Sequence, residues 1–265
     1  MRQLCGPSLA GLAGLDSMVG YEGERVLGVQ QAYADINAAL HGAFAIQVAL
    51  YHRERYGEGQ HIEVAQIEAL LSTMPEPVIH YSMNDRIVGT IGNSNDMIPV
   101  HNNYRCKGDN KWVSIAIPTE EEWEAFCNVI GDPLWTKVEE FGDNCKRSLN
   151  RGELDHRISE WTVTKTPNEV MEILQNVGVA ATPCEDTEDR FFDPHFQERQ
   201  ILIDVEHPAT GVDWIPNVIC RLSETPGGIR RPAPLLGEHN DYVFGDLLGL
   251  PKVEIERLIE EKVIF

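Results

Sequence analysis

The most informative part of the chain is YADINAALHGAFAIQVALYHRERYGEGQ, residues 33–60. From Ile36 to Tyr51, 12 of 16 residues are apolar, and they occupy nearly every face of a helical projection. This pattern predicts a central helix that is surrounded by protein, because a helix on a surface keeps one polar face. Gly57 predicts the end of the helix, since glycine readily adopts the left-handed conformation that follows a last turn. Asp35 would then lie in the first turn.

Shorter elements are predicted on both sides of this helix. Six glycines within residues 1–29 indicate an irregular N-terminal segment. After the helix, residues 61–65 alternate as a short strand, and residues 66–72 begin another helix. Prolines and glycines then indicate a loop over residues 74–101.

The second half of the chain mixes strands and helices. Two strand-like runs, 104–107 and 112–117, flank a Gly-Asp-Asn spacer and predict a hairpin. Thr119 and Thr166 each precede a glutamate by three residues, which is the spacing of a capping box at a helix start. Further strands are expected near 201–206 and 214–219, and two C-terminal helices near 238–248 and 252–262. The mixture indicates an α/β fold in two lobes.

Composition excludes several classes of partner. The chain has 22 Lys and Arg against 42 Asp and Glu, a formal net charge of −20. Nucleic-acid binding needs clustered cations, so we expect no nucleic-acid partner. The apolar run is interrupted by polar residues and is too short for a bilayer span, and residues 1–5 do not resemble a signal peptide. We therefore expect no membrane contact and a cytoplasmic location.

Several of these segments resemble the family III CoA-transferases, the formyl-CoA and carnitine CoA-transferase type. An acid at the start of an apolar helix that ends in Gly-x-Gly-Gln resembles the nucleophile segment of that family. Residues 104–117 are similar to the beginning of its small domain. Three further passages resemble family motifs: GVAATP at 178–183, DPHF at 193–196 and RPAPLLGEH at 231–239. These matches are spread over most of the chain, so we expect it to be a member.

The resemblance implies a chemistry for Asp35. As in the family, this aspartate would attack an acyl-CoA to form a mixed anhydride, which the released CoA thiolate converts to an aspartyl-CoA thioester. A helix start suits the role, because its unsatisfied N–H groups favour an ionised carboxylate. We expect no cofactor beyond the CoA thioester substrate, and no metal, since the six cysteines show no metal-ligand spacing. The region that corresponds to the glycine-rich loop of formyl-CoA transferases, which closes over the reacting carboxylate, is residues 89–95, and it departs from that loop because it has only two separated glycines. Gly92 and Asn93 are candidates for substrate binding, and the alternative is an ordinary loop whose glycines supply turn conformations.

The resemblance also implies a domain plan. Residues 1–91 would form part of a large Rossmann-like domain with the central helix, 92–185 a small α+β domain, and 186–265 a return to the large domain. Nothing in the chain resembles the nucleotide-binding half with which whole members begin. The chain would then be a C-terminal portion: a gene fragment, one half of a split enzyme or an expressed piece. Because the family forms interlocked homodimers, we expect a homodimer or a partner chain that supplies the nucleotide-binding half.

Two other functions stay open. The chain could be a non-catalytic subunit that only pairs with a longer homologue. The α-methylacyl-CoA racemase branch is disfavoured, because residues 1–5 stand where those enzymes carry His-Asp-Ile-Asn-Tyr, and the first histidine is His41. His41 lies six residues after Asp35, a spacing at which helical side chains diverge, so we expect a core histidine rather than a catalytic base. The resemblance implies an acyl-CoA and a carboxylic acid as substrates. The sequence does not identify which acyl-CoA is the donor or which acid is the acceptor.

Overall fold

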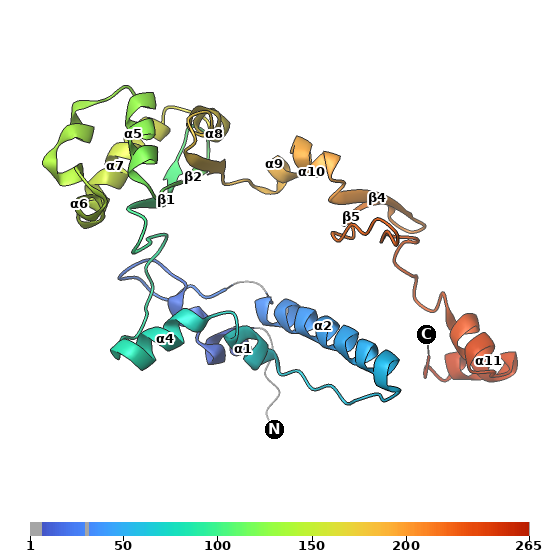
Figure 1. Cartoon of the computed structure of the whole chain (residues 1–265). Coiled ribbons are helices and arrows are strands. Elements are labelled where there is room, and N and C mark those ends of the chain that lie inside the picture. Colours follow the sequence, from blue (N-terminus) through green and yellow to red (C-terminus); the bar gives the residue numbers. More distant parts are fainter. Residues whose placement is uncertain (1–6, 30–31, 265) are drawn as a thin grey trace. The chain divides into compact units, whose positions relative to one another are not determined.

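The computed structural model describes residues 7–29 and 32–264. The chain divides into two compact units, one that runs to Cys184 and one that begins at Glu185. Both units combine helices with strands (Figure 1), which confirms the expected mixed α/β class. Within the described ranges, no helix has the length and apolar character that a bilayer span requires.

Helix α2, Tyr33–Tyr56, is the longest helix of the described chain (Figure 1). It ends at Gly57, whose φ of 78° is in the left-handed region, and the Gly57 N–H donates to the Arg53 carbonyl at 2.8 Å. The prediction of a long helix with Asp35 in its first turn is therefore confirmed.

Among the residues that the structure describes, few elements cover α2. It packs on α3, Gln66–Leu71, and on α1, Pro7–Ala13. One small buried cluster joins these helices, and it is formed by Leu9, Ala10, Ala34 and Leu70 together with Met74, which follows the end of α3. Among the described residues of α2, only two side chains are buried. The prediction of a helix surrounded by protein is wrong for this structure, because two short helices cannot cover a helix of 24 residues.

The uncovered apolar side chains of α2 form a surface that we call the α2 apolar surface: Ile36, Leu40, Phe44, Ile46, Val48 and Leu50. Leu40 is 67% exposed and Phe44 is 71% exposed. Large contiguous apolar surfaces are rare on folded monomers and usually mark interaction sites.

Three other expectations for this part of the chain are corrected. The N-terminal segment contains α1 and a 3-10 turn, Asp16–Met18, with Gly11 accommodated inside α1. Residues 61–65 form no strand. The stretch 74–101 contains helix α4, Pro75–Asn84. Its prolines start the helix rather than break it, because a first turn leaves its N–H groups unpaired in any case.

A three-stranded antiparallel sheet follows. Strand β1, Val100–Arg105, pairs with β2, Trp112–Ile117, and β2 pairs with β3, Ala180–Pro183. The predicted hairpin is confirmed. Alternate residues of β2 are buried in the main apolar core, as expected for a strand with one covered face.

Helices cover the buried face of this sheet. Thr119 and Thr166 form both predicted capping boxes at the starts of α5 and α8. The helical elements between β2 and β3 are α5 (Glu120–Val129), two 3-10 turns (Leu134–Lys137 and Glu139–Phe141), α6 (Asn144–Leu149), α7 (Arg151–Thr162) and α8 (Pro167–Gln175).

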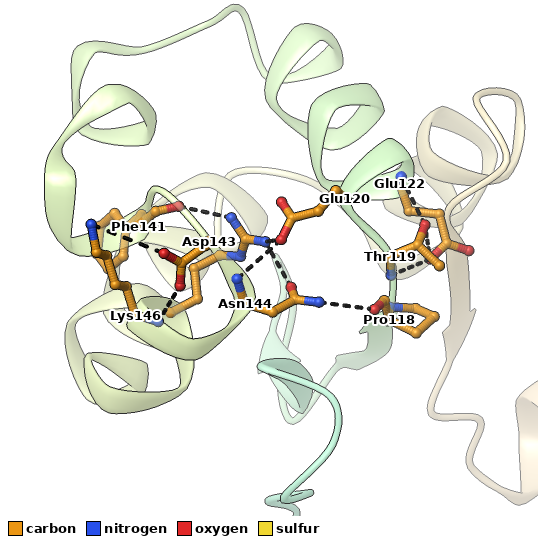
Figure 2. Close-up of polar contacts among 9 residues, drawn as sticks. Pro118, Thr119, Glu120, Glu122, Phe141, Asp143, Asn144 and Lys146 are labelled. Atoms are coloured by element: carbon orange, nitrogen blue, oxygen red, sulfur yellow. Dashed lines mark hydrogen bonds and ion pairs between the residues drawn. The ribbon is translucent and has the colours of Figure 1, made fainter.

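A buried cation ties these helices together. Arg147 on α6 is 1% exposed, and its guanidinium donates to the Phe141 carbonyl and to Asn144 Oδ1, each at 2.7 Å. It forms an ion pair of 2.5 Å with Glu120, and Figure 2 shows these three partners converging. The guanidinium also lies over the Trp123 ring, 4.7 Å from its centroid. The buried charge is thus compensated by hydrogen bonds and by an opposite charge.

The second unit is built from short elements. Its strands β4, Leu202–His207, and β5, Gly211–Pro216, form an antiparallel hairpin, and β5 begins three residues before the predicted strand. Phe191, Phe196 and Trp214 help to line a cavity of about 670 Å³. The helices are α9 (Thr187–Phe192), α10 (Pro194–Glu198), a π-helix at Asp241–Leu247 and α11 (Lys252–Glu260).

Candidate active site

Asp35 is the third residue of α2, and its side chain is exposed. The first N–H groups of a helix have no intrahelical acceptor and give this end a positive partial charge, which suits an ionised carboxylate. Gln66, the first residue of α3, donates from its side-chain nitrogen to Asp35 Oδ1 at 2.7 Å. The hydrogen bond orients the carboxylate, and the exposure leaves it accessible to a reactant.

Buried contacts on either side of Asp35 hold this segment against α3. Asn37 is buried, and its Nδ2 donates to the Ala69 carbonyl at 3.2 Å. Ala34 packs in the same cluster as Leu70. Successive helical side chains point about 100° apart, so burying residues 34 and 37 leaves residue 35 at the edge of the contact. The sequence around Asp35 therefore presents its carboxylate beside α3 without enclosing it.

Gly92 and Asn93 lie in the loop between α4 and β1, which we call the 90–95 loop. Gly92 has a φ of 60°, and its N–H donates to the Gly20 carbonyl at 2.9 Å. A Cβ atom at Gly92 would lie 3.4 Å from the Tyr21 ring, and the Thr90 hydroxyl donates to the Tyr21 carbonyl at 3.1 Å. The positive φ favours glycine at this position.

The other side of the loop contacts the sheet and α7. Asn93 Nδ2 donates to Asn102 Oδ1 at 3.1 Å, and His101 Nδ1 donates to the Asn93 carbonyl at 2.7 Å. Asn102 Nδ2 donates to Asp155 Oδ2 at 2.9 Å, and the Tyr104 hydroxyl donates to Asp155 Oδ1 at 2.6 Å. Burial, followed by the charge and the hydrogen bond of Asp155, raises the pKa of Tyr104 well above its ordinary value.

The candidate residues thus fall into two groups. Within residues 7–29 and 32–264, no hydrogen bond or ion pair joins Asp35 to the 90–95 loop. His41 is exposed, and its Nδ1 donates to the Asn37 carbonyl at 3.0 Å, so the predicted core position is wrong. Across the same described ranges, no group of three His, Cys, Asp or Glu side chains is placed to hold a metal ion.

Two residues of this region were not anticipated from the sequence. Gln66 was expected only as a helix start, and nothing local indicated a contact with a residue 31 positions earlier. Asp155 lies on a helix rich in charged residues, so its partly buried position does not stand out from the pattern.

Comparison with known proteins identifies the family. The model of "CoA-transferase family III" matches residues 5–240, a range that includes α2, the 90–95 loop and the three-stranded sheet. The chain belongs to CoA-transferase family III. The fold agrees: a CAIB/BAIF family protein from Brucella suis superposes with a TM-score of 0.82 at 24% identity, over 93% of this chain and 63% of that one.

The chain is also similar to curated proteins of Chloroflexus aurantiacus. It is 34% identical over 253 residues to the alpha subunit of a succinyl-CoA–L-malate CoA-transferase, covering 95% of this chain and 59% of the relative. It is 32% identical over 233 residues to the corresponding beta subunit, covering 87% of this chain and 57% of the relative. The chain therefore spans a little more than half the length of these two proteins.

Proposed function

We propose that this chain takes part in the transfer of CoA from an acyl-CoA to a carboxylic acid, with Asp35 as the covalent nucleophile. The observation that carries the proposal is the position of Asp35. It is an exposed carboxylate at the positive end of α2, oriented by Gln66, inside the range that the family model matches.

The proposed reaction needs only three carboxylates, those of Asp35, the donor acid and the acceptor acid, and the thiol of CoA. Asp35 attacks the thioester carbonyl of the donor, the C–S bond breaks, and CoA leaves as a thiolate from an anhydride of Asp35. The thiolate then attacks the aspartyl carbonyl and releases the donor acid, which leaves an aspartyl-CoA thioester. The acceptor carboxylate attacks this thioester, and the thiolate finally attacks the acceptor carbonyl, which restores Asp35. Electrons are only redistributed between acyl carbons, so the cycle consumes no redox cofactor.

For the substrates we propose succinyl-CoA as donor and a four- or five-carbon dicarboxylic acid as acceptor. Similar proteins are named as succinyl-CoA–L-malate, succinyl-CoA–D-citramalate and succinyl-CoA:mesaconate CoA-transferases. We further propose that the 90–95 loop, through Gly92 and Asn93, lies near the acyl group during transfer. Gly92 has no side chain, so the backbone of the loop at this position is open to a neighbouring group such as a substrate.

We also propose that Asp35 works in an assembly, either a homodimer or a complex with a partner chain that supplies the nucleotide-binding part. The exposed α2 apolar surface supports this, because such a surface is stabilised when another protein covers it. The names of the two C. aurantiacus relatives as alpha and beta subunits are consistent with paired chains. Calorimetry with CoA tests the complex with a partner chain. Binding of CoA by a mixture with a candidate partner, and not by the chain alone, would indicate a split enzyme.

Covalent trapping tests the role of Asp35. Hydroxylamine attacks activated acyl groups, so incubation of the chain with succinyl-CoA and hydroxylamine should convert Asp35 to a hydroxamate that peptide mass spectrometry locates. Asp35→Ala should show no modification and no transfer, whereas Glu54→Gln, an exposed change near the other end of α2, should behave as wild type. Transfer by Asp35→Ala at the wild-type rate would contradict the proposal. So would a hydroxamate at another residue with Asp35 unmodified.

A further inference from the structure

Asp155 on α7 holds two hydrogen-bond donors at once. Its carboxylate oxygens accept from Asn102 Nδ2 at 2.9 Å and from the Tyr104 hydroxyl at 2.6 Å. Its backbone carbonyl accepts from the Ser159 hydroxyl at 2.7 Å, within the same helix. An ionised carboxylate can only accept hydrogen bonds, so both side-chain partners must present a donor to it.

This requirement determines which way the Asn102 amide points. Its nitrogen faces Asp155, and its oxygen must therefore face the opposite side. There Oδ1 accepts from Asn93 Nδ2 at 3.1 Å and from the Asn103 backbone N–H at 2.8 Å. A neutral amide at position 155 could present either a donor or an acceptor, so the Asp155 side would no longer select the orientation of Asn102 and the Asn103 N–H alone would do so.

Two more contacts act on the same loop from the same elements. His101 Nδ1 donates to the Asn93 carbonyl at 2.7 Å, and Arg151 Nη2 donates to the Asn95 carbonyl at 2.6 Å. His101 and Asn102 belong to β1, and Arg151 lies one turn before Asp155 on α7. The 90–95 loop is therefore positioned by β1 and α7, and Asp155 supplies the negative charge in this hydrogen-bond network.

We propose that Asp155 is a positioning residue for CoA transfer. It orients Asn102, and through Asn102 it holds Asn93, so that the 90–95 loop keeps a single arrangement. The inference rests on the proposed function, in which this loop lies beside the reacting acyl group. Asp155 acts through Asn102 and is not itself a catalytic residue.

Amide hydrogen exchange on the full chain tests the structural part of this proposal without an activity assay. Asp155→Asn keeps the shape of the side chain and removes its charge. Glu153→Gln makes the same change two residues away at an exposed site, where Glu153 pairs with Arg157 at 2.8 Å. In Asp155→Asn, peptides that cover residues 90–103 should exchange roughly tenfold faster than in wild type and in Glu153→Gln, the size expected for losing a hydrogen bond to a charged group. Peptides from residues 112–117 should be unchanged.

Equal exchange of residues 90–103 in all three proteins would overturn the proposal. If Asp155→Asn loosens the whole domain, Asn102→Ala takes its place in the comparison, because it breaks the link to the loop and leaves the Asp155 carboxylate with Tyr104.

Steady-state kinetics tests the link to transfer. Asp155→Asn should lower kcat roughly tenfold with a smaller change in the KM for acyl-CoA, and Asn93→Ala should have a comparable effect. The double variant should lose little more than either single variant, because the two residues act in series. Unchanged kcat, or losses that multiply, would overturn the positioning role. Absence of transfer by wild type, both alone and with a candidate partner chain, would count against the proposed function alone, and the exchange measurement would still decide whether Asp155 holds the loop.

Discussion

Gln66 donates a hydrogen bond of 2.7 Å to Asp35 across the junction of two helices, although 31 residues separate them in sequence. Asp35 belongs to the first turn of α2, and Gln66 is the first residue of α3. A buried hydrogen bond joins the same two helices, from Asn37, two residues after Asp35, to the Ala69 carbonyl, three residues after Gln66. The packing of α2 on α3 thus sets the orientation of the proposed nucleophile.

Substitution of Gln66 should lower the rate of CoA transfer without unfolding the chain. Gln66→Ala removes one neutral donor from an exposed carboxylate, which should reduce kcat/KM roughly threefold to tenfold. Gln66→Glu should cost more, because a second negative charge repels both Asp35 and the anions that form during transfer. Steady-state kinetics with Glu68→Gln, an exposed change on the same helix, as control checks this. Equal rates for Gln66→Ala and Gln66→Glu would contradict the electrostatic explanation.

Tyr104 should make the stability of the chain depend on alkaline pH. Its pKa in the folded chain is raised well above the value of about 10 expected when unfolded, so the folded state keeps a proton that the unfolded state loses. The contribution of the protonated Tyr104 hydroxyl to the free energy of unfolding is therefore fully present below about pH 10 and is lost as the pH rises above that value. Urea unfolding between pH 8 and pH 11 should show the advantage of wild type over Tyr104→Phe shrinking above about pH 10. The free energy of unfolding of Tyr81→Phe, a change at an exposed site, should follow the pH dependence of wild type. If the curve of Tyr104→Phe is also parallel to that of wild type, the raised pKa of Tyr104 is refuted.

Arg147 should be the most sensitive charged position in the first unit. Truncation to alanine leaves Glu120, the Phe141 carbonyl and the Asn144 amide without their common donor, and it opens a cavity beside Trp123. We expect Arg147→Ala to lower the free energy of unfolding by about 3–5 kcal/mol.

The matched surface variant for this measurement is Arg157→Ala. Arg157 pairs with Glu153 and Glu160 at exposed positions, so its loss should cost about 1 kcal/mol or less. Urea unfolding at neutral pH measures both variants. Similar midpoints for Arg147→Ala and Arg157→Ala would show that the buried network contributes little.

Local signals in the sequence predicted the elements that local interactions determine. Gly57 ends α2 because its backbone adopts a positive φ, and Thr119 and Thr166 begin helices because their hydroxyls accept backbone N–H groups three residues on. The prolines at 75 and 77 predict a loop but begin α4, because proline is unfavourable inside a helix and well tolerated in its first turn.

Contacts between distant segments could not be read in the same way. The hydrogen bonds from Asn102 to Asp155 and from Gln66 to Asp35 depend on how helices and strands pack against one another. The periodicity of a sequence predicts single elements and does not predict this packing. The apolar pattern of α2 predicted burial, but most of these side chains are exposed in this structure, because a pattern does not say which element covers them. Asp35 as nucleophile, and Gly92 and Asn93 as substrate contacts, stay predictions.

The α2 apolar surface should matter for assembly and not for the stability of the isolated chain. Leu40 and Phe44 are mostly exposed, so Leu40→Glu and Phe44→Glu should change the free energy of unfolding by about 0.5 kcal/mol or less. In the assembly the same changes place a charge in an apolar interface and should weaken association roughly 30-fold or more. Analytical ultracentrifugation of the chain alone, and mixed with a candidate partner chain, measures this. Leu149→Glu, at an exposed apolar residue of α6, should assemble as wild type does, and undiminished assembly of Phe44→Glu would exclude α2 from the interface.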